Sequence, residues 1–303
     1  MKPTRSLLIT FAFLIGACAA PTTTATPRPQ PEPESQPQIP PTPTPPPATA
    51  TSLPPTETPI PEIWTPALGD SFSWQLGGNE EINTSFDVAI FDLDAFETEA
   101  SLISRLHSQG KKVICYISVG SWEDWRPDAA DFPPEVIGND YEGWEGEKWL
   151  DIRQIDLLAP IMRARMDICV AKGFDGIEPD NIDIHWANTG FDISYEDQLA
   201  YNIWLAEEAH QRGLAIGLKN NDEQVRDLLP YFDFALTEDC FDDEWCEEML
   251  PFIEAGKPVF AAEYTDRISY EKFIAEICPQ AEELGIYAFL KNRNLDEYRA
   301  DCP

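Results

Sequence analysis

Residues 173–183 read Gly-Phe-Asp-Gly-Ile-Glu-Pro-Asp-Asn-Ile-Asp. Gly173 follows an amphipathic stretch, 155–171, whose apolar residues recur with a period near 3.6, so it suits the C-cap of a helix. The apolar run after it, 176–182, predicts a buried strand. This unit is therefore a helix, a glycine and a strand whose last residues are acidic.

The same alternation recurs between residues 62 and 303. Eight short apolar runs predict strands at 72–76, 88–93, 112–119, 176–182, 215–220, 234–240, 258–264 and 286–291. Amphipathic stretches predict helices at 98–109, 155–171, 195–211 and 270–283. Eight strands alternating with helices predict a (β/α)8 TIM barrel, with a doubly wound sheet as the alternative. The first crossover, 77–87, is short, so we expect its helix to be reduced or missing.

The residues before this domain have a different composition. Residues 1–17 carry two basic residues and then an apolar run too short to span a bilayer, which predicts a signal peptide. The segment Ile15-Gly16-Ala17-Cys18 resembles a bacterial lipobox, so we expect lipid attachment at Cys18, with a plain cleaved signal as the alternative. Residues 18–61, rich in proline and threonine, predict a disordered stalk that favours polyproline II. We expect an exported protein, lipid-anchored at the membrane or cell surface or secreted.

The net negative charge belongs to the predicted barrel. The chain has a formal net charge of −33, and the residues before Glu62 carry three basic and three acidic side chains, so the whole excess belongs to 62–303. Such acidity repels nucleic acid and anionic headgroups and attracts cationic polymers. We expect no nucleic-acid partner, membrane contact only through the N-terminal lipid, and a monomer.

Six cysteines besides Cys18 suggest disulfides in an exported chain. Spacing favours two pairs and leaves a third set open between a disulfide and two buried thiols. The favoured pairs are Cys240 with Cys246 and Cys278 with Cys302, and the open set is Cys115 and Cys169. With three histidines and no CxxC or HExxH spacing, we expect no metal and no cofactor.

Acidic residues gather at the predicted strand ends. In a parallel barrel these ends converge on one pocket. Carboxylates at four or more of eight ends, without a Ser–His arrangement, indicate glycoside hydrolysis, in which one carboxyl protonates the leaving oxygen while the other stays ionised. The favoured pair is Asp180 and Glu238, and their like charges are expected to raise one pKa. The long connection 121–153 contains four tryptophans among acidic residues. These rings could stack on sugar rings, or they could pack on one another as a small hydrophobic core within the connection.

Seven segments in order resemble the endo-α-1,4-polygalactosaminidase family, glycoside hydrolase family 114. They are Trp74-Gln75-Leu76, Val113 to Gly120, Trp149 to Arg153, Gly173 to Asp183, Gly217 to Asn220, Glu238-Asp239-Cys240 and Glu263-Tyr264. The resemblance implies a barrel that cleaves α-1,4-linked galactosamine polymers, with Asp180 as nucleophile and Glu238 as acid/base, or the reverse. It further implies substrate binding by Trp74, Asp92, Tyr116, Glu178, Asn181, Asp183, Lys219, Asn220, Glu263 and Tyr264.

Two departures from the family's pattern concern the neighbourhood of Asp180. The family commonly has Asp where Glu178 stands and Cys where Phe174 stands.

Lys219 has two interpretations, a cation that keeps a catalytic carboxylate ionised or a structural ion pair. The alternatives to a polygalactosaminidase are a hydrolase of another α-linked or amino-sugar polysaccharide and a non-catalytic carbohydrate-binding barrel.

Overall fold

The computed structural model describes residues 63–77 and 82–303. The predicted signal peptide (1–17), the lipid-attachment residue Cys18 and the stalk (18–61) lie outside the described residues. Among the helices that are described, none has the length and apolar character needed to cross a membrane.

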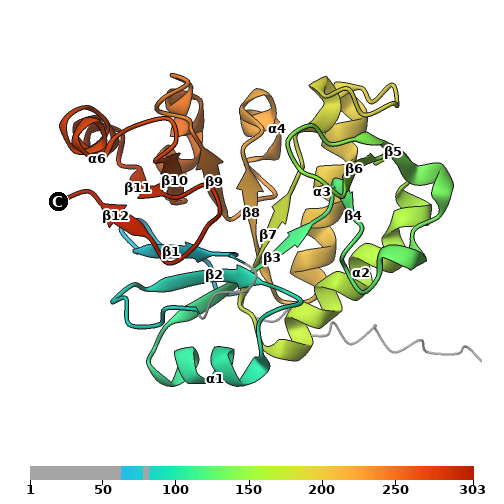
Figure 1. Cartoon of the computed structure of the whole chain (residues 1–303), viewed down its shortest axis with the longest axis horizontal. Helices are drawn as coiled ribbons and strands as arrows, with labels where there is room; N and C mark the ends of the chain where they lie inside the picture. Colours follow the sequence, from blue (N-terminus) through green and yellow to red (C-terminus); the bar gives the residue numbers. More distant parts are fainter. Residues whose placement is uncertain (1–62, 78–81) are drawn as a thin grey trace, which may run out of the picture. The chain divides into compact units, whose positions relative to one another are not determined.

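A sheet of nine strands forms the wall of an almost closed barrel (Figure 1). Eight strands run parallel, and neighbours in the sheet follow one another along the chain. They are β1 (Phe72–Gln75), β2 (Ile90–Asp94), β3 (Lys112–Ser118), β7 (Gly176–Asp180), β8 (Ala215–Lys219), β9 (Phe234–Glu238), β10 (Val259–Tyr264) and β11 (Tyr287–Lys291). The ninth, β12 (Arg299–Asp301), is antiparallel to β11. The predicted (β/α)8 barrel is confirmed.

Helices cover the outside of the barrel. The long ones are α1 (Ala100–Ser108), α2 (Ile155–Lys172) and α3 (Tyr195–Gln211), whereas α4 (Val225–Leu228) and α5 (Leu250–Glu254) have about one turn each. After β10, α6 (Tyr270–Lys272) continues through a π-helical stretch, Phe273–Ile277, into α7 (Cys278–Leu284). Pro279 there has no N–H to donate and its ring crowds the preceding turn, which accounts for the widened helix. The described residues of the β1–β2 crossover contain no helix, as its length predicted.

Two hydrophobic cores lie on opposite faces of the sheet because side chains alternate along each strand. On β9, Phe234 and Leu236 belong to the cluster inside the barrel, while Ala235 belongs to the cluster under the helices. The inner cluster is rich in aromatic rings, including Phe72 stacked on Phe260 with ring centroids 4.4 Å apart. The same parity directs Glu238 into the mouth of the barrel.

The β3–α2 connection contains structure that the sequence pattern did not predict. Its strands β4 (Ser121–Glu123), β5 (Ile137–Asp140) and β6 (Glu147–Leu150) form a separate antiparallel sheet with β6 in the middle. In Figure 1 this small sheet lies on the same side of the barrel as α2 and α3. It forms a raised wall beside one half of the barrel's mouth.

Three disulfides fasten the domain. Cys240–Cys246 and Cys278–Cys302 are the pairs that spacing favoured, and both are confirmed. Cys115 and Cys169 also form a disulfide, so the open alternative of two buried thiols is wrong. That bond joins β3 to the last turns of α2, across a sequence separation of 54, and so ties together the two elements that flank the long connection.

Candidate active site

A cavity of about 1040 Å³ opens at the carboxyl ends of the parallel strands. Both proposed catalytic residues line it, together with seven of the ten predicted substrate-binding residues. These seven are Trp74, Tyr116, Asn181, Asp183, Lys219, Asn220 and Tyr264. The other three, Asp92, Glu178 and Glu263, do not line the cavity, and their side chains have no exposed surface.

The backbone turns sharply where the central strands meet the cavity. Asn181, Asn220 and Asp239 directly follow β7, β8 and β9, and each has a positive φ, at 64°, 49° and 54°. Asn and Asp tolerate this left-handed conformation better than other side chains except glycine. The turns stop each strand at its last inward-facing residue. Asp180, Lys219 and Glu238 are therefore all placed at the rim.

Lys219 links the two proposed catalytic carboxylates. Its Nζ lies 2.8 Å from Asp180 Oδ1 and 3.2 Å from Glu238 Oε2, and it also donates to Glu178 Oε1 at 2.9 Å. The lysine itself is almost fully buried, while the side chains of Asp180 and Glu238 are 21% and 27% exposed. The lysine thus pairs with three carboxylates below a solvent-accessible surface.

Tyrosine hydroxyls complete the contacts of this pair. Tyr116 donates to Asp180 Oδ2 at 3.0 Å, and Tyr264 donates to Glu238 Oε1 at 2.5 Å. The backbone N–H of Glu238 donates to Asn220 Oδ1 at 2.9 Å. Each carboxylate is therefore oriented by at least two fixed donors, which limits its rotation.

The pKa of Glu238 differs from the sequence-based expectation. Burial raises the pKa of this carboxyl, but the charge of Lys219 and the hydrogen bond from Tyr264 outweigh burial and hold the pKa below its usual range. Like charges were expected to raise the pKa of one member of the pair. Glu238 is not that member, because Lys219 lies between the two carboxylates and offsets their repulsion.

Asp92 and Glu178 form a buried acid pair one layer below Lys219. Both oxygens of Asp92 and Oε2 of Glu178 have no hydrogen-bond partner if both groups are ionised, yet the two carboxyls are within hydrogen-bonding reach of each other. Burial and the charge of Glu178 raise the pKa of Asp92 well above its usual value, and burial raises the pKa of Glu178 to about 7. A neutral Asp92 that donates its proton to Glu178 Oε2 gives each carboxyl group a hydrogen-bond partner.

Glu263 has a different environment from the one expected. Its carboxylate accepts hydrogen bonds from the backbone N–H groups of Phe241, at 2.9 Å, and Asp242, at 3.3 Å. Strand parity explains this position, because Tyr264 on β10 belongs to the inner cluster and its neighbour faces outward. Glu263 therefore holds the loop after Glu238 and does not contact the cavity.

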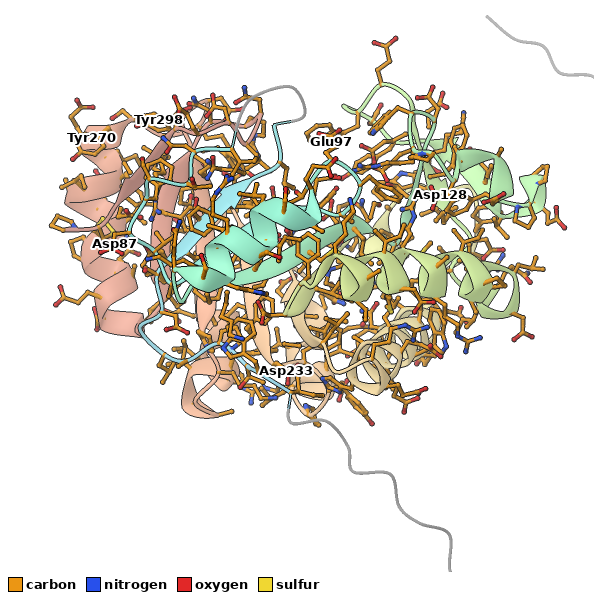
Figure 2. All side chains as sticks on the ribbon, turned by 90° about the horizontal axis from the view of Figure 1, so that it is seen from below. Asp87, Glu97, Asp128, Asp233, Tyr270 and Tyr298 are labelled. Carbon is orange, nitrogen blue, oxygen red and sulfur yellow. A yellow bond between two sulfur atoms is a disulfide. The ribbon has the colours of Figure 1, made fainter. Side chains whose placement is uncertain are left out.

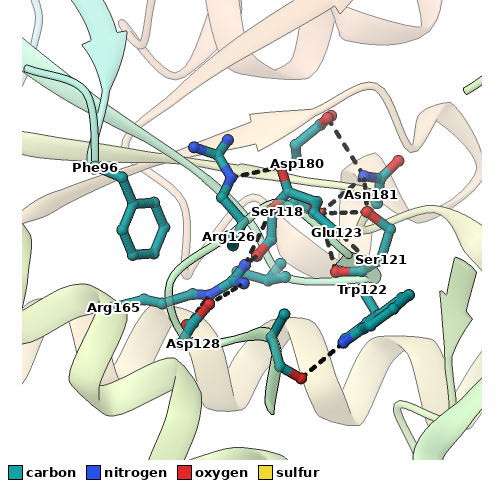
Figure 3. Close-up of polar contacts among 12 residues, drawn as sticks. Phe96, Ser118, Ser121, Trp122, Glu123, Arg126, Asp128, Arg165, Asp180 and Asn181 are labelled. Carbon is teal, nitrogen blue, oxygen red and sulfur yellow. Dashed lines mark hydrogen bonds and ion pairs between the residues drawn. The ribbon is translucent and has the colours of Figure 1, made fainter. Parts of the chain in front are cut away.

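The wall formed by β4, β5 and β6 is fastened directly to the strand end that carries Asp180 (Figure 3). Asn181 Nδ2 donates to Ser118 Oγ at 3.0 Å and to Ser121 Oγ at 3.2 Å, and Ser121 donates to Glu147 at 2.7 Å. Gly120 makes the approach possible, because a Cβ there would lie only 1.8 Å from the carbonyl oxygen of Asn181. The position of the wall is thus coupled to that of Asp180.

A buried ion cluster supports the wall from below (Figure 3). Arg165, with no exposed surface, pairs with Asp128 at 2.7 Å and donates to the carbonyl of Ser118 at 2.6 Å. Arg126 pairs with Asp94 and Glu123, each at 2.7 Å. Every arginine charge in the cluster has a partner, so the wall is held by satisfied buried groups.

Several cavity residues had no individual signal in the sequence. Tyr141 and Glu147 come from the wall, and Trp186 comes from the 3₁₀ turn Ile184–Trp186 after β7. Burial raises the pKa of Glu147 to about 7 and that of Asp183 to about 7, the latter also through the charge of Asp180. Tyr141 and Glu147 lie in 121–153, whose aromatic and acidic composition signalled them only collectively, and Trp186 had no signal.

One group of three potential metal ligands occurs in the described part of the chain, formed by Cys240, Cys246 and Glu263. A disulfide joins its two sulfur atoms, so neither is a thiolate ligand.

Comparisons with known proteins bear on the family and the fold. The model of glycoside-hydrolase family GH114 matches residues 55–303. The crystal structure of Aspergillus fumigatus Ega3 in complex with galactosamine is 34% identical, spans 79% of this chain and 97% of its own, and superimposes with a TM-score of 0.75. The glycoside hydrolase domain of PelA from Pseudomonas aeruginosa shares the fold at 15% identity and a TM-score of 0.60, over 77% of this chain and 98% of its own. An uncharacterized protein of Deinococcus radiodurans is 26% identical over 82% of this chain and 90% of its own.

Proposed function

Because this chain belongs to glycoside-hydrolase family GH114, we propose that it hydrolyses α-1,4-linked galactosamine polymers by a retaining mechanism that uses Asp180 and Glu238. The family resemblance seen in the ordered motifs is confirmed, and the protein is a glycoside hydrolase. The observation that carries the proposal is the pair of part-exposed carboxylates that share Lys219 at the cavity floor.

Asp180 is the nucleophile in this proposal. Its carboxylate oxygen attacks the anomeric carbon while the glycosidic carbon–oxygen bond breaks, and the leaving oxygen takes a proton from Glu238. Glu238 then removes a proton from water, which attacks the same carbon and releases Asp180. Tyr116 and Lys219 hold the Asp180 carboxylate in one orientation for attack.

The spacing of the pair supports retention of configuration. The contacts of Lys219 Nζ, 2.8 Å to Asp180 Oδ1 and 3.2 Å to Glu238 Oε2, leave those two oxygens at most about 6 Å apart. Retaining glycosidases hold their carboxyls roughly 5–5.5 Å apart, whereas inverting enzymes need about 6.5–9.5 Å to admit a water. The separation leaves little room for that water.

The lowered pKa of Glu238 suits its role as the base that activates water in the second step. Its role as the acid in the first step requires that Glu238 carry a proton. Burial is the largest influence on this carboxyl and already acts to raise its pKa. A bound sugar displaces water from the exposed 27% of the side chain and strengthens that influence. Substrate binding itself thus favours protonation of Glu238.

A cationic substrate fits the cavity's charge. Asp183 and Glu147 line the cavity without a basic partner among the ion pairs of the described residues, and the folded domain carries most of the chain's net charge of −33. The solved relative with 34% identity holds galactosamine, an amino sugar. We propose that free 2-ammonium groups pair with these carboxylates.

The test is a product assay with the full chain. Incubation with an α-1,4-galactosamine polymer is expected to release oligomers detectable by mass spectrometry, and Asp180→Asn and Glu238→Gln are each expected to abolish release. Equal release by both variants would refute the assignment. Cleavage of a neutral α-galactan or of chitosan in place of this polymer would show another substrate.

We also propose that the barrel is exported and tethered through Cys18 by the stalk (18–61). Three disulfides in the described domain support an oxidising compartment. Metabolic labelling with a fatty acid, lost in Cys18→Ser, would test the anchor.

A further inference from the structure

All three solvent-exposed tryptophans of this protein line the active-site cavity. Trp125, Trp144 and Trp186 are 50%, 49% and 72% exposed, whereas the other six tryptophans are buried or half-buried. Burial of the large tryptophan ring stabilises a folded domain. Exposed tryptophan rings that gather in one place are therefore usually functional. Here all three line the cavity that contains Asp180.

The rings are presented by a rigid support. The ring of Trp125 packs on the hairpin at Gly146, where an added Cβ would lie 3.0 Å from a ring carbon. In the same hairpin Tyr141 stacks on the buried Trp149, with centroids 3.8 Å apart. Trp186 belongs to the 3₁₀ turn that follows β7. The backbone that carries each ring is therefore fixed before a ligand binds, and the ring of Trp125 is also held by packing.

Acidic groups lie among these rings. Glu142, which is exposed, and Glu147 come from the same wall, and Asp183 comes from the start of the 3₁₀ turn. Asp140 is also present but is paired with Lys148. The opposite side of the cavity differs, since Arg293 there lies over Tyr264 and pairs with Asp239. The solvent-exposed tryptophan rings of the cavity, with acidic side chains beside them in the chain, therefore come from the wall and the 3₁₀ turn.

We propose that Trp125, Trp144 and Trp186, with Glu142 and Asp183, form distal subsites that bind successive ammonium-bearing sugar units of the polymer. This inference rests on the proposed function for the reaction and adds which side of the cavity the chain occupies. Sugar C–H faces stack on the indole rings, and each 2-ammonium group gains a cation–π contact or a carboxylate partner. N-acetylated units lose both charge interactions.

The experiment measures binding without turnover. In the full chain carrying Asp180→Asn, calorimetry compares a galactosamine heptamer, its fully N-acetylated form and the monosaccharide. Each single Trp→Ala change is expected to weaken heptamer affinity about fivefold, equivalent to one exposed cation–π contact of about 1 kcal/mol. The triple variant is expected to weaken it about 100-fold, with monosaccharide affinity unchanged.

Tyr270→Ala provides the matched control. Tyr270 is 51% exposed, and Figure 2 places it at the opposite end of the domain from Asp128 in the β3–α2 connection. Its removal is expected to leave heptamer affinity unchanged. Equal heptamer affinity in the triple variant, or equal affinity for the N-acetylated heptamer in the parent, would overturn the inference.

The same proteins separate this inference from the proposed function. A wild type that binds the heptamer through the tryptophans but never shortens the polymer contradicts the proposed reaction alone. A triple variant that shortens the polymer with unchanged KM contradicts the distal subsites alone.

Discussion

Substitution of Gly120 by alanine tests whether the wall of the cavity positions Asp180. The added Cβ would lie 1.8 Å from the carbonyl oxygen of Asn181, 2.8 Å from its carbonyl carbon and 2.9 Å from its Cβ. Ordinary contact begins near 3.4 Å, so the two backbones must separate by roughly 1.5 Å. The first two are backbone atoms and the position of a Cβ does not depend on the rotamer, so a change of side-chain rotamer cannot relieve the overlap.

The displacement is transmitted to the reacting group because Asn181 directly follows Asp180. A misplacement of about 1 Å can reduce an enzyme's rate about 100-fold. We expect Gly120→Ala to lower kcat/KM on the polymer about 100-fold or more and to lower the free energy of unfolding by about 1–3 kcal/mol, as overpacking does. Reducing-end release and urea unfolding measure the two effects.

Gly110→Ala is the matched control. Gly110 has a φ of +77°, and nothing lies within 4 Å of an added Cβ, so the substitution costs about 1 kcal/mol or more in backbone strain without displacing the site. It is expected to keep wild-type activity. Activity of Gly120→Ala within threefold of wild type would refute the positional argument, and an equal loss in Gly110→Ala would trace the effect to stability.

Four further outcomes are expected. Lys219→Met should lower activity at least 100-fold and lower the free energy of unfolding by about 3 kcal/mol at pH 7. Part of that stability should return at pH 5, where the carboxylates left without Lys219 take up protons; equal stability at both pH values would contradict this. Asp92→Asn, which keeps a donor toward Glu178, should unfold near the wild-type temperature, whereas Asp92→Ala should unfold earlier. With Glu238 as the acid and its pKa lowered, kcat/KM should fall as pH rises from the acidic range; a rise would favour the reverse assignment. Raising NaCl from 0.05 to 0.5 M should weaken polymer hydrolysis about tenfold, but not hydrolysis of an uncharged aryl glycoside.

Most of the barrel could be predicted from the sequence because its strands are continuous apolar runs. The run 258–264 predicted β10, Val259–Tyr264, within one residue at its start. The wall could not be predicted in this way. Its strands have three or four residues and mix glycine, acidic and basic side chains, and they are fixed by contacts with Asn181 and the ion cluster of Arg165. Such contacts connect distant parts of the chain and leave no local periodicity.

The candidate site shows the same limit at the level of single side chains. Parity along a strand predicts which face a residue occupies, and it correctly directed Asp180 and Glu238 into the barrel. It does not predict depth. Asp92 and Glu178 share the inward face but lie one layer below the rim, where the tilt of the strands places them out of reach of the cavity. The buried proton-sharing pair follows from that depth.

The partners of Lys219 explain why a lysine is compatible with a cavity that binds a cationic ligand. An ammonium group has three N–H donors, and Lys219 has three carboxylates within 3.2 Å, so no donor remains for a sugar. With Asp92 neutral, and at a pH above about 7 where Glu178 is ionised, one positive charge faces three carboxylates, so the floor stays negative. Lys219 therefore orients the reacting carboxylates without reversing the attraction for an ammonium-bearing sugar. Removal of this lysine would increase the negative charge and still impair catalysis, because attraction of the substrate and geometry of the carboxylates depend on different groups.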